Sequence, residues 1–577
     1  AGAKIVVTFS DNTSITAKIE GKKWKPGTTK TYMITEKNSN WNYIIQATSP
    51  SAVAYDATQT GNYGITSYRQ VGSEKQPVKW RVMKYQESAD GGATWSAESD
   101  TKPAWLTGLT LTQGDGSTAA QQGTATVQKA PLIDKLAPYN KVLHDATPKG
   151  SAGNYYNLSN HNGGATVENT ANSYLISAPG YYKIPLVYGN AIKGSSPNPH
   201  AYISQALTGT LNEPYILRTF KDHAGVDIDN PWITQTNSGA NAPDGAKIVW
   251  TDQSGIVEAS SLGIEGSGAN AFVHFRVPQD KIKNGNAVIA VTKGGVVVWS
   301  WHLWFDHNDV LNILPPITNF QNKTYSFTKQ TLGFAYRKWE ASTYSKPRVA
   351  RIKVEQTMTN GGIKQFGYID ITQNPGSIKE FHSTFYQFGR KDAMPGTDAI
   401  ADGSFNKNAG NYMSIQNGIQ HPENFYTYGS SWYNGYNQYN LWSMDNTTTL
   451  YNDNAVAKTI YDPCPAGLKL PASNAFTGFT TTGQNTSNSS EFNVEGSWDM
   501  GYTFKSKTGT NTVFFPAPGF RDGNDGSLFI VGYSGYYWSV VPYDTNGGCI
   551  LGFSSGYVYP LSLYSRSSGL AVRPVAE

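Results

Sequence analysis

The residues best suited to metal chemistry lie in one short stretch near the middle of the chain. His302, Asp306, His307 and Asp309 all carry side chains that can act as metal ligands. On an extended strand, side chains two positions apart share a face, so His302 and Asp306 lie on one side with Trp304 between them. A strand does not bring such ligands together locally. We therefore expect these residues to serve packing rather than metal binding.

A second possible metal site is the acidic loop at residues 522–527, which superficially resembles a calcium loop. An EF-hand loop needs Asp or Asn at its first, third and fifth positions and Gly at its sixth. Counting from Asp522, Gly526 occupies the fifth position and Ser527 the sixth, so the register fails. The sequence Asn-Asp-Gly between two Phe-rich runs predicts a hairpin turn instead. We predict no metal and no cofactor.

The strongest binding candidate is the aromatic segment at residues 424–442. Asn, Gln, Gly and Ser separate its rings, and Gly429 and Gly435 favour a loop over a continuous strand. Aromatic faces with amide and hydroxyl neighbours suit stacking on sugar rings or contact with a protein surface. The candidate ligand-binding residues are Tyr426, Tyr428, Trp432, Tyr433, Tyr436, Tyr439 and Trp442. The alternative is a long loop folded onto its own domain, with these rings filling a small core.

The sequence gives little support for catalysis, and we predict that the protein is not an enzyme. It contains no Gly-x-Ser-x-Gly elbow, no Walker-type phosphate loop and no His-Glu-x-x-His helix. A glycosidase needs two carboxylates that face one cleft. Isolated acids such as Glu340, Glu355 and Asp370 offer no argument for such a pair, so no catalytic residue is predicted.

The only cysteines are Cys464 and Cys549, too few for a disulfide-rich scaffold or a zinc site built from thiolates. A disulfide between them would close a long loop and stabilise the C-terminal domain. The alternative is two separate buried thiols, since free cysteine packs as a small hydrophobic residue. Both readings stay open at this point.

The composition indicates a β-rich protein without a nucleic-acid footprint. Only 15% of the 577 residues are charged, against about 25% in an average globular domain, whereas 13% are aromatic. Tyr, Trp, Thr, Val and Ile suit pleated surfaces, and the many Gly and Pro residues mark turns. The net charge of +4 is mild and no Lys/Arg cluster is present, so nucleic acid is not an expected partner. No apolar run is long enough to span a membrane.

Strand signals and turn residues divide the chain into consecutive pieces. Alternating strands are expected at 4–9, 14–19 and 31–35, and β-runs at 64–69, 78–85, 124–128 and 348–356. The predicted pieces are a β-segment at 1–47, an immunoglobulin-like β-sandwich at 48–135, a second β-sandwich domain at 136–312, a short β connecting unit at 313–380 and a lectin-like ligand-display domain at 381–577. The turn Trp24-Lys25-Pro26-Gly27 resembles the end of a fimbrillin-type domain, which implies that the first segment is part of such a domain.

Two short sequence motifs in the last third of the chain carry a family resemblance. The first is Tyr-Asp-Pro-Cys-Pro-Ala-Gly-Leu-Lys-Leu-Pro at 461–471, and the second is Gly-Tyr-Tyr-Trp-Ser at 535–539, followed by Gly-Leu-Ala-Val-Arg at 569–573. Together they resemble the Fibrobacter succinogenes major paralogous domain, a variant of the C-type lectin-like fold on bacterial surface proteins. Pro574 replaces the cysteine that often ends this pattern in relatives, which weakens the disulfide alternative.

Further sequence motifs extend the resemblance to most of the chain. Those at 170–176, 185–192, 285–304 and 385–392 resemble surface lipoproteins and fimbria-associated proteins of gut Bacteroidales. The resemblance covers roughly residues 155–577 and is loose in the first 150. It implies a mainly β protein with tandem β-sandwich domains of immunoglobulin or transthyretin type, followed by a C-terminal α+β C-type lectin-like domain.

The function implied by this resemblance is that of a cell-surface adhesin, a fimbrial tip or accessory subunit. Its expected partners are a host or microbial surface glycan or protein and other fimbrial subunits, and its expected location is the outer membrane surface or a fimbria. Membrane attachment is expected only through a lipid anchor that precedes this sequence. Calcium-dependent lectins use Glu-Pro-Asn or Gln-Pro-Asp with Trp-Asn-Asp, whereas this chain has Trp538-Ser539-Val540, so no calcium-dependent sugar site is expected.

Three other functions stay open. The protein could be a structural pilus subunit that polymerises by strand exchange, although the C-terminal run at 567–573 is expected to be an integral strand of its own domain. It could be a surface glycan-binding protein of a polysaccharide-uptake system. It could also be a carbohydrate-active enzyme, which turnover on a polysaccharide would establish.

Overall fold

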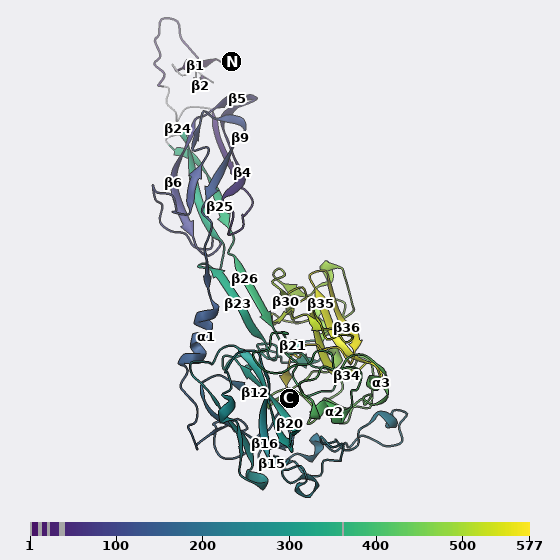
Figure 1. Cartoon of the computed structure of the whole chain (residues 1–577). Coiled ribbons are helices and arrows are strands. Elements are labelled where there is room, and N and C mark those ends of the chain that lie inside the picture. Colours follow the sequence, from purple (N-terminus) through teal and green to yellow (C-terminus); the bar gives the residue numbers. More distant parts are fainter. Residues whose placement is uncertain (1–2, 10–13, 20–22, 34–40, 361–362) are drawn as a thin grey trace. The chain divides into compact units, whose positions relative to one another are not determined.

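The computed structural model describes residues 3–9, 14–19, 23–33, 41–360 and 363–577, and in this part of the chain the protein is mainly β. Most strand pairs are antiparallel and form β-sandwich architecture, which confirms the predicted fold class at that level (Figure 1). The chain divides into two compact units. Unit 1 comprises Ala1–Lys135 and Trp339–Ile378, and unit 2 comprises Leu136–Lys338 and Lys379–Glu577. Among the described helices, none has the length and apolar character needed to cross a membrane.

Unit 1 is a sandwich of two antiparallel sheets, ordered β3-β4-β9-β7 and β25-β24-β6-β8. A separate hairpin joins β1 and β2, at the first two predicted strands. The third predicted strand, at 31–35, is not a strand at residues 31–33, and its last two residues lie outside the described part of the chain. The strands of unit 1 are β1 (Lys4–Thr8), β2 (Ser14–Lys18), β3 (Asn42–Thr48), β4 (Gln59–Val71), β5 (Glu74–Pro77), β6 (Trp80–Ser88), β7 (Leu106–Leu109), β8 (Gln113–Gly114), β9 (Ser117–Val127), β10 (Leu132–Asp134), β24 (Arg348–Asn360) and β25 (Ile363–Gln373).

The core of unit 1 depends on β24, a strand from far along the chain. Ala350, Ile352 and Val354 alternate with charged residues and are fully buried, so the predicted strand at 348–356 is confirmed. β24 pairs antiparallel with β6, where Ile352 lies opposite Tyr85. The predicted pieces 48–135 and 313–380 did not anticipate this pairing, because a period of two identifies a strand but not its partner.

Unit 2 is larger and contains several sheets and three short α-helices. The helices are α1 (Leu136–Asp145), α2 (Ile415–Gln420) and α3 (Ser430–Asn434). Its strands are β11 (Tyr156–Asn157), β12 (Ser173–Ile176), β13 (Gly180–Pro185), β14 (Ile192–Lys193), β15 (Ser196–Pro197), β16 (Gly245–Thr251), β17 (Gly263–Glu265), β18 (Phe272–Val277), β19 (Gly285–Lys293), β20 (Val296–Phe305), β21 (Ile317–Thr318), β22 (Thr324–Tyr325), β27 (Asp402–Gly403), β28 (Leu468–Lys469), β29 (Val494–Glu495), β30 (Gly501–Lys505), β31 (Thr512–Pro516), β32 (Phe520–Arg521), β33 (Leu528–Phe529), β34 (Ser534–Pro542), β35 (Gly547–Ser554), β36 (Tyr557–Ser565) and β37 (Val575–Ala576). β23 (Ala335–Ser342) and β26 (Ser377–His382) run through points where the chain passes from one unit to the other.

The central sheet of unit 2 has the order β12-β20-β19-β16-β27. β19 and β20 are apolar on both faces and buried along nearly their whole length, as expected for strands covered on both sides. β12 runs parallel to β20, with Ser173 opposite His302. The sequence motifs at 170–176 and 285–304 thus form neighbouring strands of one sheet.

One hydrophobic core joins the two halves of unit 2, and it includes residues from Leu143 to Val572. The Asn172 amide donates to the backbone carbonyl oxygens of Ile460 (2.7 Å) and Asp462 (2.8 Å). The Ser300 hydroxyl donates to Asp392 Oδ1 at 2.7 Å. The predicted domains 136–312 and 381–577 therefore share one core, since each supplies buried groups that the other satisfies.

Candidate functional site

The potential metal ligands on and after β20 all take protein partners. His302 is 1% exposed; its Nε2 lies 2.9 Å from Asn286 Oδ1, and burial lowers its pKa to about 3. Asp306 Oδ1 accepts from the Tyr139 hydroxyl at 2.5 Å and from the His307 backbone N–H. Within the described residues, no group of three or more His, Cys, Asp or Glu side chains is arranged to hold a metal. These contacts fit the packing role expected from the sequence.

The acidic loop at 522–527 is the hairpin turn that the sequence predicts. It connects β32 and β33, in which Arg521 lies opposite Leu528. The Asp522 backbone N–H donates to the Ser527 carbonyl at 2.9 Å, and the Gly526 N–H donates to the Asp522 carbonyl at 2.8 Å. The Asp522 side chain accepts the Asn524 N–H at 2.7 Å, so it stabilises the turn from within.

The two cysteines are separate, buried, free thiols, not a disulfide. Cys464 lies in the turn at 461–471, where Asp462 accepts its backbone N–H at 2.7 Å and that of Leu470 at 3.2 Å. Burial raises the pKa of the Cys464 thiol well above its ordinary value and raises that of Cys549 to about 12. Both side chains therefore act as small core residues.

Most of the aromatic segment at 424–442 is core. Trp432 donates from Nε1 to the Thr427 carbonyl at 3.0 Å, and Trp442 donates to the Tyr461 carbonyl at 3.1 Å, so both indole N–H groups are satisfied internally. Five of the seven candidate residues are at most 6% exposed, namely Tyr426, Trp432, Tyr436, Tyr439 and Trp442. A ligand cannot stack on these five rings in this conformation. For them, the structure corresponds to the alternative of a loop folded onto its own domain.

The other two candidates, Tyr428 and Tyr433, remain accessible and lie together. Tyr428 is 52% exposed, and its ring packs edge-on against Tyr433 with centroids 5.3 Å apart. Tyr433 belongs to α3, and Tyr428 lies just before it. Burial, followed by the contact with Tyr428, raises the pKa of Tyr433, so its phenol stays protonated.

Backbone contacts hold these rings in place from two other loops. The Tyr428 N–H donates to the Gly523 carbonyl at 2.6 Å, and the Thr427 N–H donates to the Gly410 carbonyl at 2.8 Å. Gly429 leaves no room for any side chain, because a Cβ there would lie 2.2 Å from the Asn411 Cβ. The chain is thus fixed on both sides of Tyr428.

Tyr412 follows Asn411, is 69% exposed and was not among the predicted site residues. An isolated tyrosine outside an aromatic-rich run gives no local signal. Through the close approach of Asn411 to Gly429, it lies on a loop adjacent to Tyr428. We call Tyr412, Tyr428 and Tyr433 the tyrosine loop site. Asn408 and Asn524 are exposed on the adjoining loops and could hydrogen-bond to a ligand whose ring stacks on a tyrosine.

Comparison with known proteins gives a family match over part of unit 2. Residues 484–575 match a family described as a Domain of unknown function (DUF8237). None of the curated proteins compared with the chain matches it.

Two solved structures of cadherin domains align weakly with the chain. The crystal structure of the Protocadherin GammaB4 extracellular domain aligns at 8% identity with a TM-score of 0.10, over 58% of this chain and 51% of the other. Protocadherin Gamma B2 extracellular cadherin domains 3-6 align at 8% identity with a TM-score of 0.10, over 58% of this chain and 78% of the other. The chain thus spans about half the length of the first of these, and a likeness at this TM-score carries no argument about fold or function.

Proposed function

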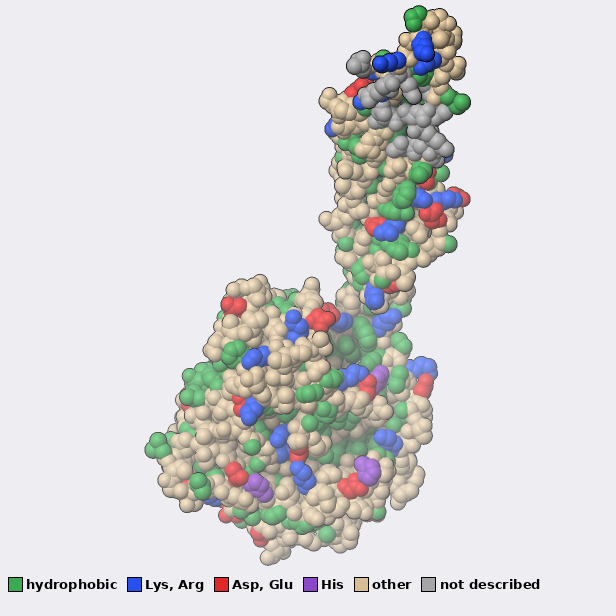
Figure 2. All heavy atoms as spheres, turned by 180° about the vertical axis from the view of Figure 1, so that it is seen from behind, with side chains coloured by type: hydrophobic (Ala, Val, Ile, Leu, Met, Phe, Trp, Pro, Cys, Tyr) green, Lys and Arg blue, Asp and Glu red, His purple; other side chains and the backbone are tan. Residues whose placement is uncertain are grey.

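We propose that the protein is a cell-surface adhesin that binds a host or microbial glycan or protein through the tyrosine loop site of unit 2. The observation that carries this proposal is the contact between exposed Tyr428 and half-buried Tyr433, with Tyr428 held in place by its backbone bond to Gly523. Rigid aromatic side chains supply contact area at low entropic cost. Low charge also suits such a role, and Figure 2 shows basic side chains scattered singly over the visible face of unit 2.

The family resemblance supports a place at the tip of a fimbria or as an accessory subunit on the outer membrane surface. The C-terminal region is tied into its own unit, since β37 pairs with β28 and Leu570 bridges to Tyr386. A shaft subunit that polymerises by strand exchange needs a strand that can be exchanged. These pairings favour the tip over the shaft. Concentration-dependent polymers after proteolytic trimming would favour the shaft instead.

The test is a glycan-array and mucin-binding screen with the full chain, with calcium and again with EDTA. Saturable binding that survives EDTA supports a calcium-independent adhesin, whereas binding lost in EDTA contradicts the calcium-independent part. Preference for dietary polysaccharides would select a glycan-uptake protein, and turnover of a polysaccharide would establish an enzyme. Absence of glycan binding would shift the proposal to a protein partner.

The site itself is tested by the double variant Tyr428→Ala/Tyr433→Ala. Aromatic anchors at binding sites commonly contribute enough that their loss weakens binding by about tenfold or more. Tyr533→Ala is the matched control, because Tyr533 is 74% exposed elsewhere on unit 2. Equal loss in the control, or a collapse of thermal stability in the double variant, would contradict the assignment of the site.

A further inference from the structure

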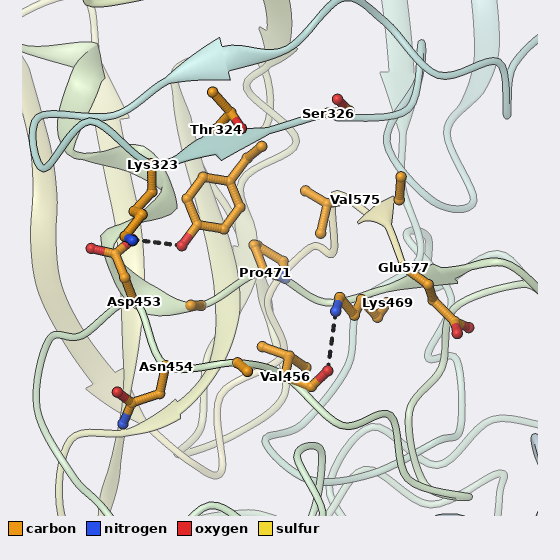
Figure 3. A pocket seen from close by; sticks show the side chains of 14 residues that line it. Lys323, Thr324, Ser326, Asp453, Asn454, Val456, Lys469, Pro471, Val575 and Glu577 are labelled. Carbon is orange, nitrogen blue, oxygen red and sulfur yellow. Dashed lines mark hydrogen bonds between the residues drawn. The ribbon is translucent and has the colours of Figure 1, made fainter.

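A second candidate site on unit 2 uses none of the tyrosine loop residues. It is a pocket of about 490 Å³, within the usual range of roughly 300–1,000 Å³ for small-molecule sites. Figure 3 shows Lys323 and Asp453 at one end, with Lys469 and Glu577 at the other. β22, the loop at 453–456, β28 and β37 supply the walls.

The frame of the pocket is held by short strand pairs. β28 and β37 are antiparallel, with Lys469 opposite Val575, and the Glu577 N–H donates to the Gly467 carbonyl at 3.0 Å. The Ala576 N–H donates to the Ser326 carbonyl at 2.9 Å, which ties β37 to the segment that follows β22. The pocket is therefore formed without any movement of the chain.

One end of the pocket presents a fixed carboxylate. Asp453 Oδ1 accepts from the Tyr325 hydroxyl at 2.6 Å and from Asn319 Nδ2 at 2.7 Å, and its Oδ2 accepts from Asn474 Nδ2 at 3.0 Å. A carboxylate offers about four acceptor positions, so one stays available on Oδ2. Burial, followed by Asp453, raises the pKa of Tyr325, which keeps the phenol protonated as a donor. Asp453 is thus oriented to accept a ligand hydroxyl.

The other end presents an ammonium group. Lys469 Nζ donates to the Val456 carbonyl at 3.0 Å, which leaves two of its three donors for a ligand. Glu577 forms an ion pair with Lys193 and lies 3.9 Å from Lys458 Nζ, so neighbouring cations balance its negative charge. Lys469 is therefore not needed to balance the charge of Glu577.

Between these ends the lining is partly apolar and partly polar. Val456, Pro471, Ala472 and Val575 line it, and Tyr325 adds its ring. Thr324 and Ser326 add hydroxyl-bearing residues to the lining. A ligand that matches needs an apolar face, several hydroxyl groups and one anionic group. A zwitterionic amino acid would supply the charges but would leave the hydroxyl-bearing lining unused.

We propose that this pocket binds an acidic monosaccharide residue, a hexuronate or a sialic acid. Its carboxylate pairs with Lys469, its hydroxyls donate to Asp453, and the carbon face of its ring lies on the half-buried side chains of Tyr325 and Val456. The inference goes beyond the proposed function, because it assigns a ligand class to a site separate from the tyrosine loop.

Calorimetric titration of the full chain tests the proposal with D-glucuronate, D-galacturonate and N-acetylneuraminate at millimolar concentration. D-glucose and D-galactose are the matched controls, because they lack only the carboxylate of the two hexuronates, and glycine tests for zwitterion binding. Binding of an acid at least tenfold tighter than that of neutral sugars and glycine is expected. Equal binding of the neutral sugars, preference for glycine, or no binding of any acid would overturn the proposal.

Variants separate the roles of the two ends. Lys469→Gln should weaken acid binding at least tenfold, whereas Lys283→Gln, an exposed lysine elsewhere in unit 2, should leave it unchanged. Asp453→Asn should also weaken binding at least tenfold, and Tyr325→Phe checks the same end if that variant unfolds. Unchanged affinity in Lys469→Gln would overturn the assignment. The Tyr428→Ala/Tyr433→Ala variant should bind the acidic sugars as tightly as the parent does. A failure of the adhesin proposal and a failure of this pocket proposal therefore give different results.

Discussion

The indole Nε1 of Trp538 donates to the backbone carbonyl oxygen of Tyr386 at 2.6 Å. Both groups are buried, and 152 positions separate them in sequence. Trp538 belongs to the sequence motif at 535–539 and Tyr386 to the motif at 385–392. The hydrogen bond therefore joins two motifs that carry the family resemblance. The Phe388 ring packs edge-on against Trp538 at 5.4 Å, which places the same contact inside an aromatic cluster.

Trp538→Phe is expected to lower the free energy of unfolding by about 2–4 kcal/mol. The change leaves a buried carbonyl without its donor, at roughly 1–3 kcal/mol, and opens a small cavity. Chemical denaturation measures the loss. Trp24→Phe is the control, because Trp24 is 67% exposed, and it should change stability by no more than about 0.5 kcal/mol. Similar values for both variants would contradict the role of the bond.

Residues 379–577 expressed alone are not expected to fold. Their buried groups find partners in residues 136–338, as Asp392 does in Ser300, and their apolar side chains share the same core. Near-ultraviolet circular dichroism should show no fixed aromatic packing. A chain of residues 136–338 and 379–577 joined by a Gly-Ser linker is the control and should fold. A cooperative unfolding transition in the shorter fragment would show that the core is separable.

Asp306 is expected to make the protein less stable as the pH rises from about 4 to 6. Burial raises its pKa to about 6, and its Oδ2 has no hydrogen-bond partner. Between pH 4 and 6 the folded state keeps a proton that the unfolded state has released, so stability falls as pH rises. The full cost, about 3 kcal/mol for a shift of roughly two pH units, is present above pH 6.

Asp306→Asn removes this titration. The unfolding free energy of the variant minus that of the parent should therefore rise by about 2–3 kcal/mol between pH 4 and 7. Denaturation curves collected across that range measure the difference. A difference that does not vary with pH would show that Asp306 titrates alike in the folded and unfolded states.

The two thiols should be unreactive in the folded protein. Cys464 and Cys549 are fully buried and their pKa values are raised, so neither offers an accessible thiolate. Ellman's reagent should detect no thiol under native conditions and two after denaturation without reductant. Detection of none after denaturation would indicate a disulfide in the purified protein.

The sequence predicted the local structure well where one period or one turn decides it. The alternation at 348–356 identified β24, and the Asn-Asp-Gly turn identified the hairpin between β32 and β33. It could not identify partners, because the alternation of β24 fits any sheet with one buried face.

The candidate site was predicted only in part, for a related reason. An aromatic-rich loop has the same composition whether its rings are displayed or buried. What buries Trp432 is a carbonyl five residues away, at Thr427, that satisfies its N–H. Tyr428 and Tyr433 stay accessible in the same segment, and no sequence feature distinguishes them from their buried neighbours.

The late position of β24 and β25 has a consequence for the order in which the protein is synthesised. The sandwich of unit 1 cannot close when β9 leaves the ribosome, because two strands of its second sheet are encoded about 220 residues later. At roughly 5–20 residues per second, that wait lasts on the order of ten to forty seconds. During this time β6 has an unpaired edge on the side that β24 later covers. A nascent chain of this kind needs protection of that edge until residue 373 has been made.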